Sequence, residues 1–433
     1  MNPPQNRTGR LVRRVLLASG LLTLMASLGA VALVYGWTQF ARTLPPLKGW
    51  HLDRPRSEFV ASDATGTYDL AAYRQQEDQV FRELDTLIRG PWASEVDGRF
   101  NRFGAESVCN PARLLDRNWN RTYVLESPKP VGGVLLLHGL SDSPYSLRAM
   151  AERLHGLGYT VVGLRVPGHG TCPGALAAVS WTDWTAAVRV AAAGVRKMIP
   201  EGTPLILFGY SNGGALSVNY ALEALEQPGL PKPQALVLFS PMIGINPLAK
   251  VTRFHTAIAA ISGDPRANWS ALDAEIDPYK YAGWPMNASV QAWRMTRQVE
   301  ERLRKVQAAG RIPELPPMIA FQSAIDSTVV VPRLVTELFD RVGTDRSELV
   351  LFDVNRAGWL ENLVNLGFER KVEPLLRNSS DGYTLTLVTN ESADSVRVVA
   401  KPRSSVAIPA AGRLSPSVRG VRPVATAADL EEV

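Results

Sequence analysis

The stretch that decides the fold runs from residue 205 to residue 216 and reads Leu-Ile-Leu-Phe-Gly-Tyr-Ser-Asn-Gly-Gly-Ala-Leu. Its first four residues are apolar, as in a buried strand, and helical spacing of apolar residues follows from Gly213. Between them, residues 209–213 match G-x-S-x-G, which places a serine on a sharp strand-to-helix turn. Small neighbours suit a strained turn, and the helix behind it directs positive dipole potential toward developing negative charge. We therefore take Ser211 as a candidate nucleophile, in preference to an incidental serine in a glycine-rich turn.

A second motif lies about 70 residues before this serine, where the apolar run Leu135–Leu137 ends in His138-Gly139. An acyl-transfer site needs two backbone N–H groups to hold an oxyanion, one just after the nucleophile and one from such an earlier loop. Asn212 and Leu140 are the candidates for these oxyanion-hole donors. His138 itself is interpreted as a residue that orders the loop rather than as a base.

A third motif places Asp326 just after the apolar run Met318–Gln322. In sites with the chain order Ser, Asp, His, an acid at this point orients an imidazole and stabilises its charged form. Asp326 is therefore the candidate acid, in preference to an ordinary loop or helix-capping aspartate.

Short apolar runs alternate with longer stretches of helical spacing from residue 131 onward, which predicts an α/β fold with a mostly parallel sheet. The expected strands are Val134–His138, Thr160–Leu164, Leu205–Tyr210, Ala235–Ser240, Met318–Gln322, Leu349–Val354 and Tyr383–Thr389. The expected helices are Tyr68–Ile88, Ser146–Leu157, Trp184–Met198, Gly213–Glu226, Val290–Val306 and Val331–Val342. Residues 241–316 interrupt the alternation without an expected strand and are predicted to form a helical cap over the site.

The N-terminus carries four arginines within residues 1–14 and no acid, and the 23 residues Val15–Trp37 that follow are uncharged. This run is long enough to cross a hydrocarbon core of ~30 Å, and the preceding arginines orient its N-terminus toward the cytoplasm. We favour a transmembrane anchor over a signal peptide, whose apolar region is usually shorter, although Ala30-Val31-Ala32 is an acceptable cleavage site. Residues 38–60 are then expected to form an exposed linker.

The net charge of +6 comes from the two ends of the chain, because acids and bases are equal in number between residues 15 and 400. A basic footprint for nucleic acid is therefore absent, and no nucleic-acid partner is predicted. Cys109 and Cys172 are the only cysteines and lack the C-x-x-C spacing of a thiolate metal site. They form either one disulfide or two free thiols.

These motifs together resemble the α/β-hydrolase family, in particular the branch with monoacylglycerol lipases and serine-aminopeptidase-like enzymes. The resemblance covers residues 130–355 and includes His138-Gly139, the loop 166–170, the segment 181–184, Ser211 and Asp326. It implies a sheet of about eight strands with a cap, no cofactor or metal, and hydrolysis of an ester, thioester or amide through an acyl-serine intermediate. The substrate is expected to be a small acyl compound, including a lipid.

The resemblance also implies a membrane-anchored bacterial protein, single-pass in the inner membrane, with its catalytic domain on the periplasmic or extracellular side. The predicted division of the chain is 1–14 basic cytoplasmic tail, 15–37 anchor, 38–130 linker and N-terminal extension, 131–400 hydrolase domain with its cap at about 241–316, and 401–433 disordered tail.

One departure from the family concerns the base, because no histidine follows Asp326 in the sequence. The family generally places this histidine after the last sheet strand. Some membrane-anchored bacterial relatives carry it in a later C-terminal extension, after a segment like residues 383–390, and here that extension is the histidine-free tail beyond Ala400. Three accounts stay open. The tail is aberrant, for example through a shifted reading frame, and leaves an impaired hydrolase; His255 or His169 serves as an unusual base, a role that the resemblance does not support; or the protein binds a ligand or partner without turnover.

Overall fold

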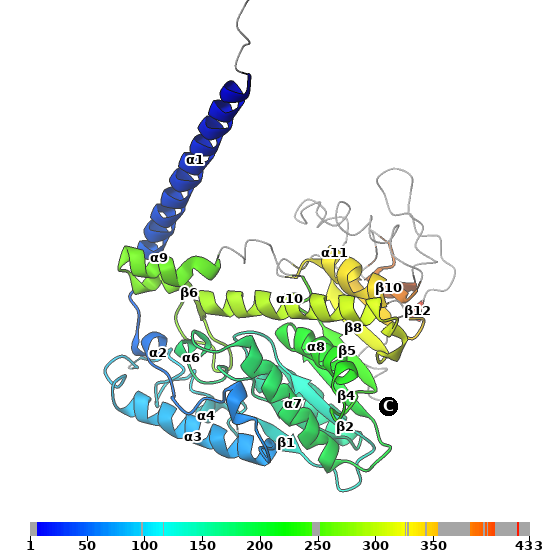
Figure 1. Cartoon of the computed structure of the whole chain (residues 1–433). Helices are drawn as coiled ribbons and strands as arrows, with labels where there is room; N and C mark the ends of the chain where they lie inside the picture. The colour runs from blue at the N-terminus through cyan, green and yellow to red at the C-terminus, as the bar shows by residue number, and fades with distance from the viewer. Residues whose placement is uncertain are drawn as a thin grey trace, which may run out of the picture.

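The computed structural model describes residues 7–96, 98–115, 117–244, 252–324, 326, 329–342, 344–353, 382–392, 395, 397–402 and 422–423 (Figure 1). Within these ranges, ten strands form one sheet in the order β1-β3-β2-β4-β5-β8-β9-β10-β11-β12. The strands are β1 (Tyr123–Leu125), β2 (Gly133–Leu137), β3 (Thr160–Leu164), β4 (Leu205–Tyr210), β5 (Ala235–Phe239), β8 (Met318–Ser323), β9 (Glu348–Asp353), β10 (Thr384–Asn390), β11 (Val398–Pro402) and β12 (Arg422–Pro423).

The pairs that run from β3 to β10 are parallel, whereas β1, β11 and β12 pair antiparallel at the two edges. A parallel centre with antiparallel edge strands is the α/β architecture that the alternation predicts, with a sheet larger than the eight strands expected. Each expected strand is present to within a residue at its ends, except that Val354 lies outside the described residues.

Helices cover both faces of this sheet. They include α3 (Leu70–Arg89), α5 (Arg148–Gly156), α7 (Trp181–Met198), α8 (Asn212–Glu226) and α10 (Met286–Ala308), with short helices α2 (Gly49–Leu52), α4 (Pro111–Leu114) and α6 (Pro173–Leu176). The expected helix at residues 331–342 consists of α11 (Val331–Leu334), a π-helical segment (Val335–Phe339) and α12 (Asp340–Val342). α7 and α8 pack against β2 to β5 on one face, while α5 packs against β1 and β3 on the other.

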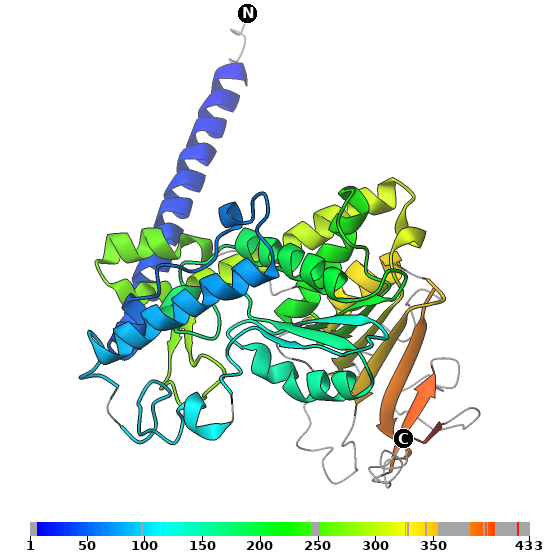
Figure 2. The ribbon, with the colours of Figure 1, turned by 90° about the horizontal axis from the view of Figure 1, so that it is seen from below.

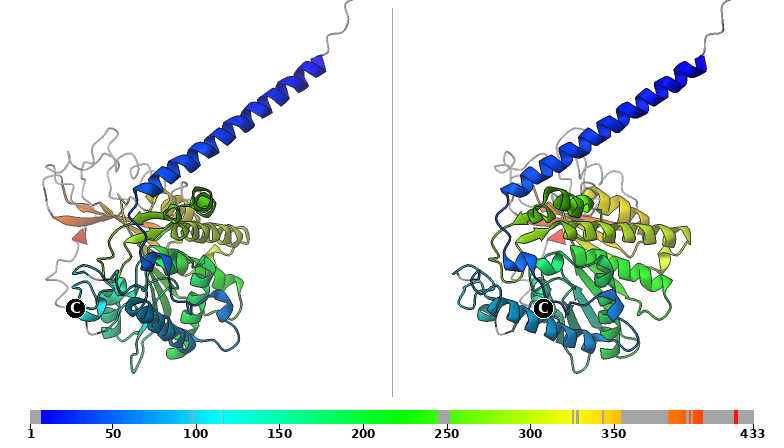
Figure 3. Two further views of the ribbon diagram at one scale, coloured as in Figure 1. Left: turned by 90° about the vertical axis from the view of Figure 1, so that its left-hand side faces the viewer. Right: turned by 60° about the vertical axis from the view of Figure 1, so that its left-hand side comes forward.

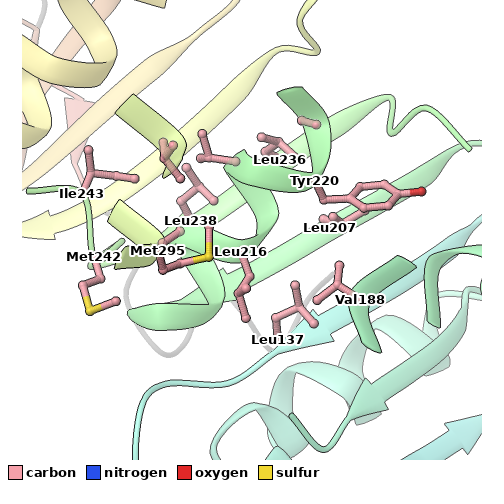
Figure 4. Packing of buried hydrophobic residues seen from close by; sticks show 14 of the residues in the cluster. Leu137, Val188, Leu207, Leu216, Tyr220, Leu236, Leu238, Met242, Ile243 and Met295 are labelled. Carbon is pink, nitrogen blue, oxygen red and sulfur yellow. The ribbon is translucent and has the colours of Figure 1, made fainter. Parts of the chain in front are cut away.

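On β2, β3, β4 and β5, alternate residues enter two separate apolar clusters, as the two-residue period of a strand requires. On β4, Leu205 and Leu207 belong to the larger cluster, whereas Phe208 belongs to the smaller one. Figure 4 shows Leu207 on the side of the sheet covered by α8, near Leu216 and Tyr220. The helix that follows Ser211 is therefore held by the main core of the molecule.

The N-terminal helix α1 (Arg7–Thr43) projects away from the rest of the molecule (Figures 1 and 3). The segment Arg13–Thr43 is long and apolar enough to cross a membrane and is exposed along most of its length, a pattern that fits a membrane anchor or a signal sequence. The expectation of an exposed linker over residues 38–60 is wrong, because Trp50 and His51 of α2 are buried. Trp50 packs against Trp92 and Phe103, residues too distant in sequence for composition to reveal the contact.

The insertion between β5 and β8, called here the β5–β8 insertion, begins at Ser240 and ends at Pro317. It contains α9 (His255–Ser262), a 3₁₀ turn (Pro265–Asn268) and α10, with 245–251 outside the described residues. The expectation that it lacks strands is wrong, because β6 (Trp269–Leu272) and β7 (Gly283–Pro285) form an antiparallel pair. These strands are short and β7 ends in proline, so neither shows the alternation by which strands are identified.

The end of the chain departs from the expected disordered tail at two places. β11 extends to Pro402, and β12 pairs with it through Ala400 and Val399 (Figure 2). The other residues of 401–433 lie outside the described part. Both cysteines are free thiols: Cys172 is buried beside Trp50 and Trp92, and Cys109 is half-buried.

Candidate functional site

Ser211 lies at the junction of β4 and α8 in a conformation that L-residues rarely adopt, with φ 52° and ψ −112°. Its N–H donates to the carbonyl of Phe239 (2.9 Å), and its own carbonyl accepts from the N–H groups of Gly214 (2.9 Å) and Met242 (2.9 Å). A positive φ at a non-glycine residue persists only where the surroundings hold it, and here β5 and the first turn of α8 both do. The half-buried hydroxyl is thereby presented at the carboxyl end of β4.

The glycines around Ser211 are required by close backbone approach. A Cβ at Gly213 would lie 1.9 Å from the carbonyl oxygen of Leu137, and one at Gly209 would lie 2.4 Å from that of Gly213. Contacts this short exclude any side chain unless the backbone moves. The glycines of the G-x-S-x-G pattern are therefore needed because α8 begins in direct contact with the end of β2.

The predicted oxyanion donors lie on either side of Ser211. Asn212 is the first residue of α8, and Leu140 follows Gly139, where an added Cβ would lie 3.4 Å from Cβ of Ser211. Within the described residues, neither the N–H of Leu140 nor that of Asn212 has a hydrogen-bond acceptor. Two free amides beside a hydroxyl, one at the N-terminus of a 15-residue helix, favour negative charge at this point.

His138 connects the two loops that border the site. Val166 donates its N–H to Nε2 of His138 (3.0 Å), so Nδ1 carries the proton and donates to the carbonyl of Gly139 (2.8 Å). Burial holds the pKa of His138 well below its ordinary value, so the ring is neutral. This bonding fits the loop-ordering role expected for His138.

Asp326 follows β8, two strands away from β4 in the sheet. Its Oδ1 accepts from the N–H of Val329 (2.9 Å), and its Oδ2 accepts from Nε2 of the buried Gln322 (3.0 Å). The pKa of Tyr210, next to Ser211, is raised chiefly by burial and then by the charges of Asp142 and Asp326. Both carboxylates therefore lie close enough to the Tyr210 hydroxyl to affect its ionisation.

No histidine joins Ser211 and Asp326, although all five histidines of the chain lie within the described residues. Nδ1 of His255 lies 2.7 Å from Oδ1 of Asn268, and Nδ1 of His169 lies 3.0 Å from the carbonyl oxygen of Pro167. His169 is fully buried beside His138 and Trp184, and burial lowers its pKa to about 4. Neither of these two candidate bases is hydrogen-bonded to Ser211 or Asp326.

Two features of the site were not anticipated from the sequence. Asp142 is buried, accepts the N–H of Ser143 at Oδ1 (2.9 Å), and has its pKa raised to about 6 by burial. Tyr281 of the β5–β8 insertion donates its N–H to the carbonyl of Ser141 (2.8 Å) and its hydroxyl to that of Gly168 (3.1 Å). The sequence could have indicated Asp142, because it lies three residues after Gly139 in the same loop. Tyr281 belongs to no local motif that would have indicated it.

Potential metal ligands are not clustered in the described part of the chain, where no group of three or more His, Cys, Asp or Glu side chains is arranged to hold an ion.

Comparison with known proteins agrees with the architecture. The model of the family described as serine aminopeptidase, S33, matches residues 128–355. A curated relative, the thermostable monoacylglycerol lipase of Bacillus sp. (strain H-257), is 24% identical over 219 residues, which are 50% of this chain and 79% of the relative.

Solved structures with a similar fold include a monoacylglycerol lipase from Paleococcus ferrophilus (19% identity, 54% of this chain and 88% of that chain, TM-score 0.40). A soluble variant of monoglyceride lipase from Saccharomyces cerevisiae is 16% identical over 53% of this chain and 81% of its own, with a TM-score of 0.41. A structure of the metagenome-derived lipolytic enzymes LipS and LipT gives 24% identity, 54% and 88% coverage and a TM-score of 0.42.

The sheet, the strand-to-helix serine and the flanking loops define an α/β hydrolase of the serine type. The chain belongs to the serine aminopeptidase S33 family and is similar to a monoacylglycerol lipase.

Proposed function

We propose that this chain is a membrane-anchored serine hydrolase that cleaves an ester, thioester or amide bond of a small acyl substrate, including a lipid. Ser211 is the nucleophile, Asp326 the acid, and the N–H groups of Leu140 and Asn212 hold the oxyanion. The observation that carries the proposal is the strained turn of Ser211 beside two amides without an acceptor. The lipase activity named for the relatives supports the substrate class.

In this mechanism the Ser211 hydroxyl attacks the acyl carbon, its proton passes to water, and negative charge develops on the carbonyl oxygen. The N–H groups of Asn212 and Leu140 stabilise that charge, and the leaving group departs with a proton from water. Water then attacks the acyl-serine and releases the acid. Loss of the base in a working triad costs about 10⁶ in rate, whereas oxyanion stabilisation and binding retain about 10³ to 10⁴ over water. We therefore expect slow turnover.

The membrane part of the proposal rests on α1, whose apolar residues are exposed along most of its length. The helix anchors the protein, with its arginine-rich end in the cytoplasm and the hydrolase domain on the other side of a bacterial inner membrane. The β5–β8 insertion is the cap, because it leaves the sheet at the carboxyl end of β5, next to Ser211.

A fluorophosphonate probe tests the nucleophile in the full-length protein. Because no histidine activates Ser211, we expect slow labelling of the wild type over a long incubation. This labelling should be lost in Ser211→Ala and retained in Ser262→Ala, a matched removal of a half-buried serine hydroxyl on α9. Mass spectrometry of the labelled peptide locates the adduct.

The second candidate function is binding of a ligand or partner without turnover. It is favoured by one observation, the lack of a hydrogen bond from any histidine to Ser211 within the described residues. If the folded wild type takes no label after long incubation, with or without added imidazole, the hydrolase proposal is wrong and the binding function is preferred.

A further inference from the structure

The lower end of α1 is joined to the β5–β8 insertion by specific contacts. Nε1 of Trp37 donates to the carbonyl of Ala267 (3.0 Å), and Nη1 of Arg266 donates to that of Leu44 (2.9 Å). Ala41 is fully buried against Ile258 of α9 and Ala267. Figure 1 shows α9 at the foot of α1. This joint fixes α9 relative to the anchor.

The position of the joint along α1 sets the depth of α9. The uncharged run Val15–Trp37 has 23 residues, which at 1.5 Å per residue span about 34 Å, close to the ~30 Å of a hydrocarbon core. Val34 and Trp37, which pack in the joint, therefore lie where the hydrocarbon meets the headgroups. α9 packs against them and lies at the same level.

The outward face of α9 is apolar, although it is exposed in the chain alone. Phe254, which precedes the helix, is 45% exposed and Ile261 is 70% exposed, and Ala257 lies between them on the same face. The helix carries no Asp, Glu, Lys or Arg. Surface helices that face water normally present charge on this side, whereas helices in a membrane interface present apolar residues. The exposed Arg253, whose guanidinium lies 4.6 Å from the Phe254 ring centroid, adds a cation for lipid phosphate.

We propose that α9 is a membrane-binding helix that inserts Phe254 and Ile261 into the interfacial layer of the leaflet from which α1 emerges. This proposal rests on the anchoring of α1 proposed above, and it adds a second contact made by the cap. The occupant of the apolar face is phospholipid, because α9 packs against α1 at Val34 and Trp37, where the lipid-exposed part of α1 ends. The cap, and with it the carboxyl edge of the sheet, is then held against the bilayer.

The test places an environment-sensitive fluorophore at Ile261→Cys in the full-length protein, with Cys109→Ser in the background and Cys172 left buried. The protein is reconstituted into phosphatidylcholine–phosphatidylglycerol vesicles that contain lipids spin-labelled near the top of the acyl chain. We expect a blue-shifted emission that the spin-labelled lipid quenches. A label at Leu157→Cys is the matched control, because Leu157 is an exposed leucine before β3, at the sheet edge opposite the cap.

A third label, at the exposed Leu28 of α1, separates the two proposals. It is read with lipids spin-labelled deep in the acyl chain. If Leu28 is quenched and Ile261 behaves like Leu157, the membrane role of α9 is wrong and the anchor stands. If Leu28 is not quenched either, the anchor is wrong and the role of α9 fails with it. A blue-shifted Ile261 label that spin-labelled lipid leaves unquenched shows that protein covers α9, as in a dimer, and also overturns the proposal.

Discussion

The Ser211 hydroxyl is placed by backbone hydrogen bonds from β5 and α8, so its position does not depend on a histidine partner. Its reactivity does depend on one, because a serine is a weak nucleophile until a base accepts its proton. We therefore expect the position of Ser211 and its proposed reactivity to be separable, so that a base in solution can supply the reactivity.

Added imidazole is expected to restore part of this reactivity. Free imidazole is a base near neutral pH, and it would accept the Ser211 proton in place of the missing side chain. Hydrolysis of a p-nitrophenyl ester, measured as initial rate, should rise with imidazole concentration in the wild type beyond its rise in Ser211→Ala. Equal slopes for the two proteins would show that imidazole acts on the ester in solution and not through Ser211.

Asp142 is expected to make stability depend on pH. Burial raises its pKa to about 6 from an ordinary value of 3.8, so the folded protein holds this proton to higher pH than the unfolded chain does. Its contribution to the free energy of unfolding is therefore greatest below pH 4 and falls as pH rises to about 6, by about 3 kcal/mol. Asp142→Asn should remove this loss. Urea unfolding of both proteins across this pH range gives the difference, and a difference that stays constant contradicts the assignment.

The positions of several candidate-site residues were predictable, because these residues belong to local motifs. Ser211, Asn212 and Leu140 belong to short patterns at the ends of β4 and β2, and these neighbouring parallel strands bring the patterns together. The pKa of Asp142 was not predictable, because its burial is a property of the folded site and not of the local sequence.

At the scale of elements, β4 and α8 function as one unit whose geometry depends on glycine. Gly213 is the tightest point, where α8 passes the carbonyl of Leu137 at the end of β2. Any side chain here moves α8 away from the sheet, and the amide of Asn212 moves with it.

Gly213→Ala should therefore lower the free energy of unfolding by about 2–4 kcal/mol and abolish fluorophosphonate labelling. Gly156→Ala is the matched control, because an added Cβ at Gly156 in α5 meets no atom within 4 Å. That substitution should stabilise by up to about 1 kcal/mol through helix propensity. Denaturant unfolding measures both, and equal effects of the two substitutions would contradict the packing described for Gly213.

The sequence predicted the central strands best, because a short run of apolar residues between turn signals indicates a buried strand and is too short for a helix. Thr160–Leu164 and Leu205–Tyr210 match β3 and β4 at both ends. The short antiparallel strands β1, β6 and β7 were missed, because three or four residues show no periodicity and their pairing partners lie elsewhere in the chain.

At the scale of the whole molecule, a buried ionic network ties the N-terminal region to the hydrolase fold. Arg165, after β3, is fully buried and contacts Glu58 through Nη2 (2.8 Å) and Glu77 of α3 through Nε (3.0 Å). Glu77 also accepts the N–H of Thr122 (2.8 Å). Glu58 and α3 are therefore part of the folded body.

Glu77→Gln should cost about 3 kcal/mol in the free energy of unfolding, because it leaves the buried Arg165 charge with one carboxylate fewer. Asp78→Asn, the neighbouring residue of α3, is the matched control: its ion pair with Arg121 is exposed and contributes under about 1 kcal/mol. Thermal or urea unfolding of the two variants distinguishes them. A similar small loss in both would mean that the network contributes little.

The alternation of apolar runs predicted the sheet from residue 131 onward, but not the attachment of residues 49–96. Trp50, Trp92 and Cys172 are far apart in the sequence, and no local pattern indicates that they share one apolar cluster. In this part of the chain only the helix over Tyr68–Ile88 was predictable, because its apolar residues recur at spacings of three and four.

The joint between Trp37, Ala41 and the insertion has a practical consequence for work in detergent-free buffer. Removal of residues up to Thr43 would take away the α1 side chains that cover Ile258 and Ala267, which are almost fully buried in the intact chain. The shortened protein would then expose an apolar surface that promotes aggregation and is unrelated to its activity. A truncation that begins the protein at Val34 keeps that covering and removes most of the apolar part of α1.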